Sequence, residues 1–75
     1  MVGEKINIRR IKEERVAKGF SISEMSEALG YQSYVAYYRK EEGQRRFSTN
    51  DVAKIAEKLD LDLDKIFLDD KLTNR

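Results

Sequence analysis

The sequence has 75 residues, of which 40% are hydrophobic and 39% charged, and its formal net charge is +1. A chain of this length forms one domain with a small core, and its apolar content is too high for a disordered segment. Because it contains neither Cys nor His, it lacks disulfides, a thiolate nucleophile and the usual ligands of zinc, copper and iron, so we expect no metal and no cofactor.

Glycines and capping residues divide the first part of the chain into predicted helices. An apolar stripe predicts a helix from 8 to 18, and Gly19 supplies its left-handed end. Ser21-Ile22-Ser23-Glu24 has the Ser-x-x-Glu spacing of a capping box, in which the hydroxyl and the carboxylate each satisfy a backbone amide. A second helix therefore begins there, and Gly30 ends it after about two turns.

A third helix is predicted from the N-cap Ser33 to about Glu42. No continuous apolar stripe follows this helix, although all four tyrosines lie within it or just before it. We expect Tyr37 to belong to the core, whereas Tyr34 and Tyr38 lie on another side of the helix. Much of this helix should therefore face solvent or a partner.

Two further helices complete the predicted fold. Ser48-Thr49-Asn50-Asp51 repeats the capping-box spacing and begins a strongly amphipathic fourth helix. The acidic residues Asp60 and Asp62 precede a short fifth helix that closes the core. We predict an all-α, compact five-helix bundle that spans residues 1–75 as a single domain, with a core of about 8–68 and a tail at 69–75.

The segment Ser21–Glu42 has the pattern of a helix-turn-helix: a short capped helix, a turn that begins with Gly, and a helix rich in hydrogen-bonding side chains. In such a motif the second helix presents its N-terminal half to bases in the major groove. Arg39 can pair with guanine, and Val35 can contact a thymine methyl group. The expected base-contacting residues are Ser33, Tyr34, Val35, Tyr38 and Arg39.

Candidate phosphate contacts lie on both sides of that helix. The amides at the start of the second helix are unsatisfied donors, and the loop after the third helix offers two guanidinium groups on a flexible backbone. A basic pair in a loop is otherwise usually a solvated surface, but its position after the predicted DNA-contacting helix favours phosphate binding. The expected phosphate-contacting residues are Ile22, Ser23, Lys40, Gln44, Arg45 and Arg46.

From Ile8 to Leu68 the chain resembles the Cro and phage-repressor type helix-turn-helix proteins, also called the xenobiotic response element family. The matching segments are Arg15–Ser21, Met25–Tyr31, Lys40–Gly43, Arg46–Ser48, Val52–Ala56 and Leu63–Phe67. The resemblance implies a lambda-repressor-like domain that binds operator DNA, commonly as a dimer, and an ion pair between Arg15 and Glu41. Two positions depart from the family pattern, since Ile22 stands in place of Gln and Glu14 in place of Leu.

These patterns predict a sequence-specific regulator of transcription that binds double-stranded DNA, of the phage or mobile-element repressor type. We expect no enzyme and no small-molecule substrate, because the short helical chain offers no cleft with positioned His, Cys or paired carboxylates. The alternative is a helix-turn-helix protein-interaction module with little DNA affinity: an antirepressor, antitoxin partner or adaptor. Ile22 and the low net charge favour this alternative, whereas Arg39, Arg45 and Arg46 favour DNA.

Apolar residues near the C-terminus exceed what a small core absorbs and predict a symmetric homodimer contact. These residues are Leu63, Phe67, Leu68 and Leu72. In such a dimer the two DNA-contacting helices lie about 34 Å apart, on half-sites of a palindromic operator. No apolar run approaches the roughly 20 residues that cross a bilayer, and the first residues lack the apolar stretch of a secretory signal. We therefore expect a cytoplasmic protein without membrane contact.

Overall fold

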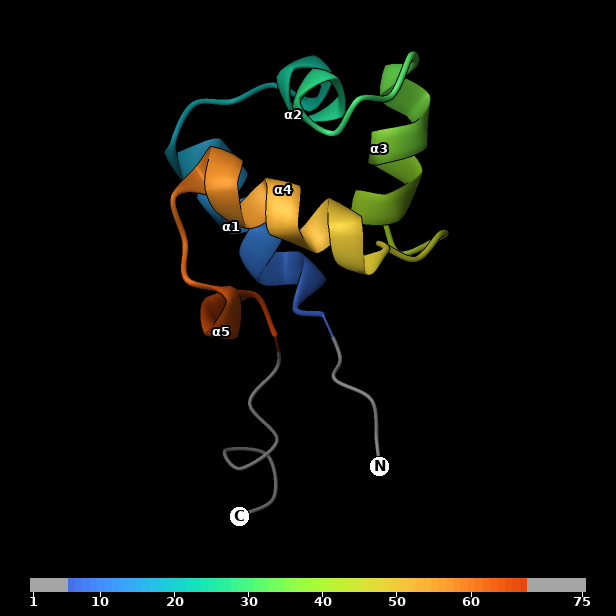
Figure 1. The fold of residues 1–75 in the computed structure, drawn as a ribbon. Helices are drawn as coiled ribbons and strands as arrows, with labels where there is room; N and C mark the ends of the chain where they lie inside the picture. Colours follow the sequence, from blue (N-terminus) through green and yellow to red (C-terminus); the bar gives the residue numbers. More distant parts are fainter. Residues whose placement is uncertain (1–5, 68–75) are drawn as a thin grey trace.

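Five α-helices make up the fold in the computed structural model, which describes residues 6–67 (Figure 1). The helices are α1 (Ile8–Ala17), α2 (Ile22–Ala28), α3 (Tyr34–Glu41), α4 (Thr49–Leu59) and α5 (Leu63–Ile66). Between residues 6 and 67 the structure contains no strand beyond one isolated bridge, so the predicted all-α fold is confirmed. None of the helices in this part is long and apolar enough to cross a membrane.

Side chains satisfy backbone amides at the start of the first four helices. At α1 the Asn7 Oδ1 accepts a hydrogen bond of 3.0 Å from the Arg10 amide. Both predicted capping boxes are present: Ser21 with Glu24 begins α2, and Ser48 with Asp51 begins α4. Each such cap contributes about 1 kcal/mol to the stability of the helix that it begins. Short polar motifs in the sequence therefore indicate where these helices start.

The same backbone motif ends the first four helices. After α3, Gly43 adopts a φ of 84°, and the amides of Gly43 and Gln44 donate to the carbonyls of Lys40 and Arg39 at 3.1 and 2.8 Å. This is the Schellman arrangement, and the two glycines that follow α1 and α2 repeat it. After α4 the left-handed residue is Asp60, with a φ of 56°. The sequence has no glycine there to mark the end of the helix.

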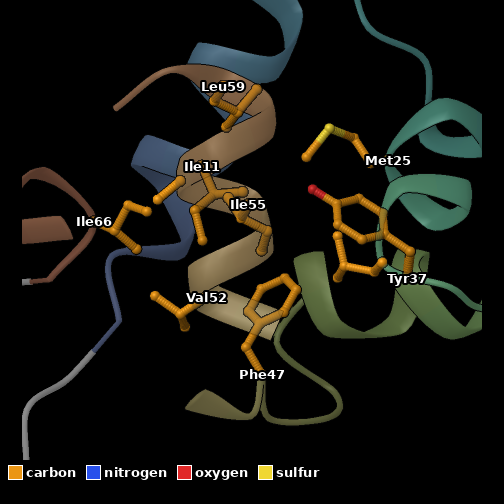
Figure 2. Close-up of a cluster of buried hydrophobic side chains, with 10 residues drawn as sticks. Ile11, Met25, Tyr37, Phe47, Val52, Ile55, Leu59 and Ile66 are labelled. Carbon is orange, nitrogen blue, oxygen red and sulfur yellow. The ribbon is translucent and has the colours of Figure 1, made fainter. Parts of the chain in front are cut away.

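The core is built around α4, whose apolar face contacts side chains from the other four helices (Figure 2). Figure 2 shows Ile55 and Leu59 of α4 between Ile11 on one side and Met25 and Tyr37 on the other. The ten buried apolar residues are Ile11, Met25, Leu29, Tyr37, Phe47, Val52, Ile55, Ala56, Leu59 and Ile66. A single core therefore holds both halves of the predicted helix-turn-helix against α4.

The two ends of the described chain lie side by side (Figure 1). Ile6 forms an antiparallel bridge with Phe67, and the Asn7 amide donates to the Ile66 carbonyl at 2.6 Å. Phe67 is consequently extended, and the fifth helix is shorter than the apolar run in the sequence. Leu68 and Leu72, two of the predicted dimer residues, lie outside the described residues.

We predict opposite effects on stability for two substitutions at helix ends. Asp60→Gly should raise the free energy of unfolding by about 1 kcal/mol, because a Cβ is unfavourable in the left-handed region. Gly19→Ala should lower it by about 1 kcal/mol for the same reason, although a Cβ at Gly19 meets nothing within 4 Å. Urea unfolding followed by circular dichroism measures both. Effects of the same sign would contradict this explanation of the helix ends.

Candidate nucleic-acid interface

The corner between α2 and α3 is held by a buried hydroxyl. The Ser26 side chain is almost fully buried, and its Oγ donates to the Ser33 carbonyl at 2.9 Å. The Tyr31 amide donates to the Ser26 carbonyl at 3.0 Å, so one residue of α2 binds the connecting turn at two points. The turn therefore fixes the direction in which α3 leaves α2.

α3 is divided into a buried side and an exposed side. Tyr37 is completely buried, and its ring centroid lies 5.9 Å from that of Phe47. Tyr34 and Tyr38 are 58% and 45% exposed, which agrees with the predicted division of the tyrosines. Of the other expected base-contacting residues, Ser33 and Arg39 are exposed and Val35 is half-buried. The five residues thus lie at the start of α3 or on its accessible surface.

A buried ion pair beneath α3 joins this helix to α1. Glu41 accepts hydrogen bonds from Arg15 Nε at 2.9 Å and from Arg15 Nη2 at 3.0 Å, so the structure contains the pair that the family resemblance implies. The Tyr37 hydroxyl donates to the same carboxylate at 2.7 Å, and Arg15 Nη1 donates to the Phe20 carbonyl at 2.9 Å. Burial and the bond to Glu41 both raise the pKa of Tyr37.

A family model described as helix-turn-helix matches residues 11–66, which include all five helices except the first turn of α1. The chain belongs to this helix-turn-helix family. Membership of the family confirms the prediction of a DNA-binding regulator. In a helix-turn-helix protein α3 is the recognition helix and α2 the helix that precedes it.

Among solved structures, the chain is similar to the restriction-modification controller protein C.AhdI from Aeromonas hydrophila. The TM-score is 0.69 and the sequence identity 29%, and the match covers 77% of this chain and 86% of the controller protein. No curated protein matches the sequence. The chain therefore resembles this controller protein both in fold and in sequence.

Lys40, an expected phosphate contact at the end of the recognition helix, is bonded inside the protein. Its Nζ donates to Asp51 Oδ2 at 2.7 Å and to the Tyr31 hydroxyl at 2.6 Å. Burial alone would lower the pKa of Lys40, but these two hydrogen bonds raise it above its ordinary value. The pKa of Asp51 is lowered, because the bonds from Lys40, Tyr31 and the Ser48 amide outweigh the effect of burial.

This second buried pair was not predicted from the sequence. It connects the turn of the helix-turn-helix, through Tyr31, to the recognition helix and to the capping box of α4. The only sequence signal was Asp51 itself, whose position in the capping box showed that its carboxylate lies at the start of α4. Nothing in the spacing indicates that Lys40 reaches it.

The remaining expected phosphate contacts are accessible. The Ser21 hydroxyl accepts from the Glu24 amide and the Ser21 carbonyl from the Met25 amide, which leaves the amides of Ile22 and Ser23 in the first turn of α2. The Ile22 side chain packs against the core, whereas the family's Gln is polar at this position. The Glu24 carboxylate lies at the same helix end, and the hydrogen bond from the Ser21 amide lowers the pKa of Glu24. The start of α2 thus carries the amides of Ile22 and Ser23 together with the negative charge of Glu24.

The loop after the recognition helix folds back onto it. The amides of Gln44 and Arg45 donate to the Arg39 carbonyl at 2.8 and 3.3 Å. Gln44, Arg45 and Arg46 are all exposed. One backbone carbonyl therefore links the expected base contact Arg39 to the expected phosphate contacts in the loop.

Among residues 6–67, no cluster of acidic side chains is arranged to hold a metal ion.

We expect Asp51→Asn to lower the free energy of unfolding by about 2 kcal/mol at neutral pH, because it removes a charge-assisted hydrogen bond from a largely buried ammonium. The folded-state pKa of Asp51 lies below its ordinary value of 3.8, so the carboxylate stabilises the fold above that pH. This stabilisation is lost as the pH falls through the lower, folded-state pKa.

The difference in unfolding free energy between the wild type and Asp51→Asn should consequently shrink at pH values below 3.8. Urea unfolding at neutral and acidic pH measures it. Asp62→Asn is the matched control, because Asp62 is likewise an acid at the start of a helix but makes no side-chain cap hydrogen bond. A difference for Asp51→Asn that does not change with pH would contradict the assignment.

Proposed function

We propose that this protein is a sequence-specific regulator of transcription that binds operator DNA as a homodimer and places α3 in the major groove. The observation that carries the proposal is the division of α3. Tyr37 and Glu41 anchor its inner side, while Tyr34, Tyr38 and Arg39 leave its outer side exposed. A solvent-exposed row of hydrogen-bonding side chains on a rigid helix is the arrangement that contacts base edges.

The residues that we propose for DNA contact fall into two groups. Base contacts come from Ser33, Tyr34, Val35, Tyr38 and Arg39, and phosphate contacts from the amides of Ile22 and Ser23 and from Gln44, Arg45 and Arg46. The Ser33 Oγ accepts from the Val35 amide, which leaves its hydroxyl proton free to donate to a base. Lys40 is a positioning residue in this scheme, because its ammonium is bonded inside the protein.

We also propose the phage or mobile-element repressor class and a cytoplasmic location, as the family resemblance implies. The similar controller protein is, by its name, a regulator of restriction-modification. Its likeness supports a regulatory role for this chain, without naming the genes that this chain controls.

A homodimer contact at α5 leaves α3 free for DNA. Leu63 is 51% exposed and Phe67 half-buried, both at the C-terminal end of the described residues. In Figure 1 α5 and α3 lie at opposite ends of the fold, with α4 between them. A symmetric contact through these side chains holds two recognition helices in one assembly, as a palindromic operator requires.

Arg39→Ala and Arg45→Ala should separate base contacts from phosphate contacts. We expect Arg39→Ala to lose roughly 1–3 kcal/mol of binding free energy at one base position, and so to relax sequence preference there. Arg45→Ala should weaken binding to all duplexes alike and lower the salt dependence by about one unit.

Fluorescence-anisotropy titration with selected and random duplexes, at about 50 mM and 200 mM salt, distinguishes the two effects. An operator is first obtained by selection from a random duplex pool. If both variants lost the same affinity for selected and random duplexes, our separation of roles would be wrong. If the wild type bound no duplex at low salt, the proposed function itself would fail.

Leu63→Lys should convert the dimer to a monomer and weaken operator binding at least tenfold, because a buried lysine at a symmetric contact is present twice and unpaired. Analytical ultracentrifugation gives the mass. Val16→Lys is the control, since Val16 is 60% exposed on α1, outside the proposed contact. A sedimentation mass that Leu63→Lys leaves unchanged would exclude this dimer.

A further inference from the structure

Salt bridges divide the six arginines between residues 6 and 67 into two classes. Arg10 pairs with Glu14 at 3.3 Å and Arg15 with Glu41 at 2.9 Å, and both are partly buried. The other four are exposed and have no acidic partner within this part of the chain. They are Arg9, Arg39, Arg45 and Arg46. Three of these are proposed DNA contacts, and the fourth, Arg9, has no assigned role.

The stability of α1 does not account for Arg9. This residue occupies the first turn of α1, which contains no acidic residue. A cation near a helix N-terminus opposes the helix dipole and is mildly destabilising. Glu13 lies one turn further along α1 and is not paired with Arg9 in the structure. The fold therefore gains nothing visible from a positive charge at this position.

The first turn of α1 lies against the segment that leads into the loop arginines. A Cβ at Gly43 would be 3.9 Å from the Cδ1 of Ile8, the residue that precedes Arg9. The Nζ of Lys12 is 3.7 Å from the Glu42 Oε2, at the end of the recognition helix. Lys12 follows Arg9 by three positions, so the two side chains are neighbours on the surface of α1.

We infer that Arg9 belongs to the DNA-binding surface and contacts the phosphate backbone, extending the row formed by Arg45 and Arg46 from the α3–α4 loop onto α1. The partner is a phosphate because Arg9 lies on α1, outside the recognition helix that enters the groove, and its neighbours Arg45 and Arg46 are themselves proposed phosphate contacts. This inference rests on the proposed function and adds a contact outside the helix-turn-helix itself.

The test compares four substitutions at two positions in the first turn of α1. Arg9→Ala should lower the affinity for selected and random duplexes equally and reduce the slope of log affinity against log salt by about 0.9 per bound protomer. The ratio of wild-type to variant affinity is then about three to four times larger at 50 mM than at 200 mM salt for each protomer. Arg10→Ala is the matched control, with the same change of charge in the same turn at a paired arginine. It should leave the slope unchanged.

Arg9→Glu separates DNA contact from any structural role. It places an acid in the first turn of α1 and should therefore raise the melting temperature, while it lowers duplex affinity more than Arg9→Ala does. Arg9→Lys should retain the wild-type slope. Equal slopes for Arg9→Ala and Arg10→Ala, while Arg45→Ala lowers its slope, would overturn the role of Arg9 and leave the proposed function intact. A wild type that binds no duplex would overturn both.

Discussion

The buried carboxylate of Glu41 is the group on which the orientation of the recognition helix depends. It accepts three hydrogen bonds, two from the Arg15 guanidinium and one from the Tyr37 hydroxyl, and Arg15 also binds the Phe20 carbonyl. Such a pair contributes little net stability compared with apolar residues of the same volume, but removal of one partner leaves an uncompensated buried charge. Its main effect is therefore geometric: α3, α1 and the turn that leads to α2 pack together in one relative arrangement.

A second buried pair on the adjacent residue extends this restraint. Lys40 binds Tyr31 in the turn and Asp51 at the start of α4, so consecutive residues of α3 are held from two directions. Both pairs lie at the C-terminal end of the helix. The exposed side chains of Tyr34 and Tyr38 lie on the surface of a helix whose position is already fixed. The two ion pairs therefore hold the recognition helix in place on the rest of the fold.

Most of the fold was predictable from the sequence because helix ends are decided locally. Capping boxes and glycines specify starts and ends over a few residues, whatever the rest of the chain does. Asp60 ends α4 without a glycine, in a left-handed conformation with the same local hydrogen bonds as the other helix ends, so no glycine in the sequence marks this end. Two features of the site were predictable. The sequence pattern predicted that much of α3 is exposed, and the family resemblance implied the Arg15–Glu41 pair. The inward position of Lys40 was not predictable, because it depends on a distance between two helices. The proposed role of Arg9 could not be predicted for the same reason, since the contacts of its neighbours Ile8 and Lys12 with the end of α3 and Gly43 exist only in three dimensions.

The bridge between Ile6 and Phe67 closes the described chain into a ring. Asn7 caps α1 through its side chain and donates its amide to Ile66, so the residue that begins the first helix is also bound to the end of the last one. Because the two ends meet, the chain can be joined across this bridge and opened elsewhere. A circularly permuted chain that is opened in the loop between α4 and α5 keeps every helix–helix contact. The surface that α3 exposes therefore depends on how the helices pack, and not on the order in which they follow one another along the chain.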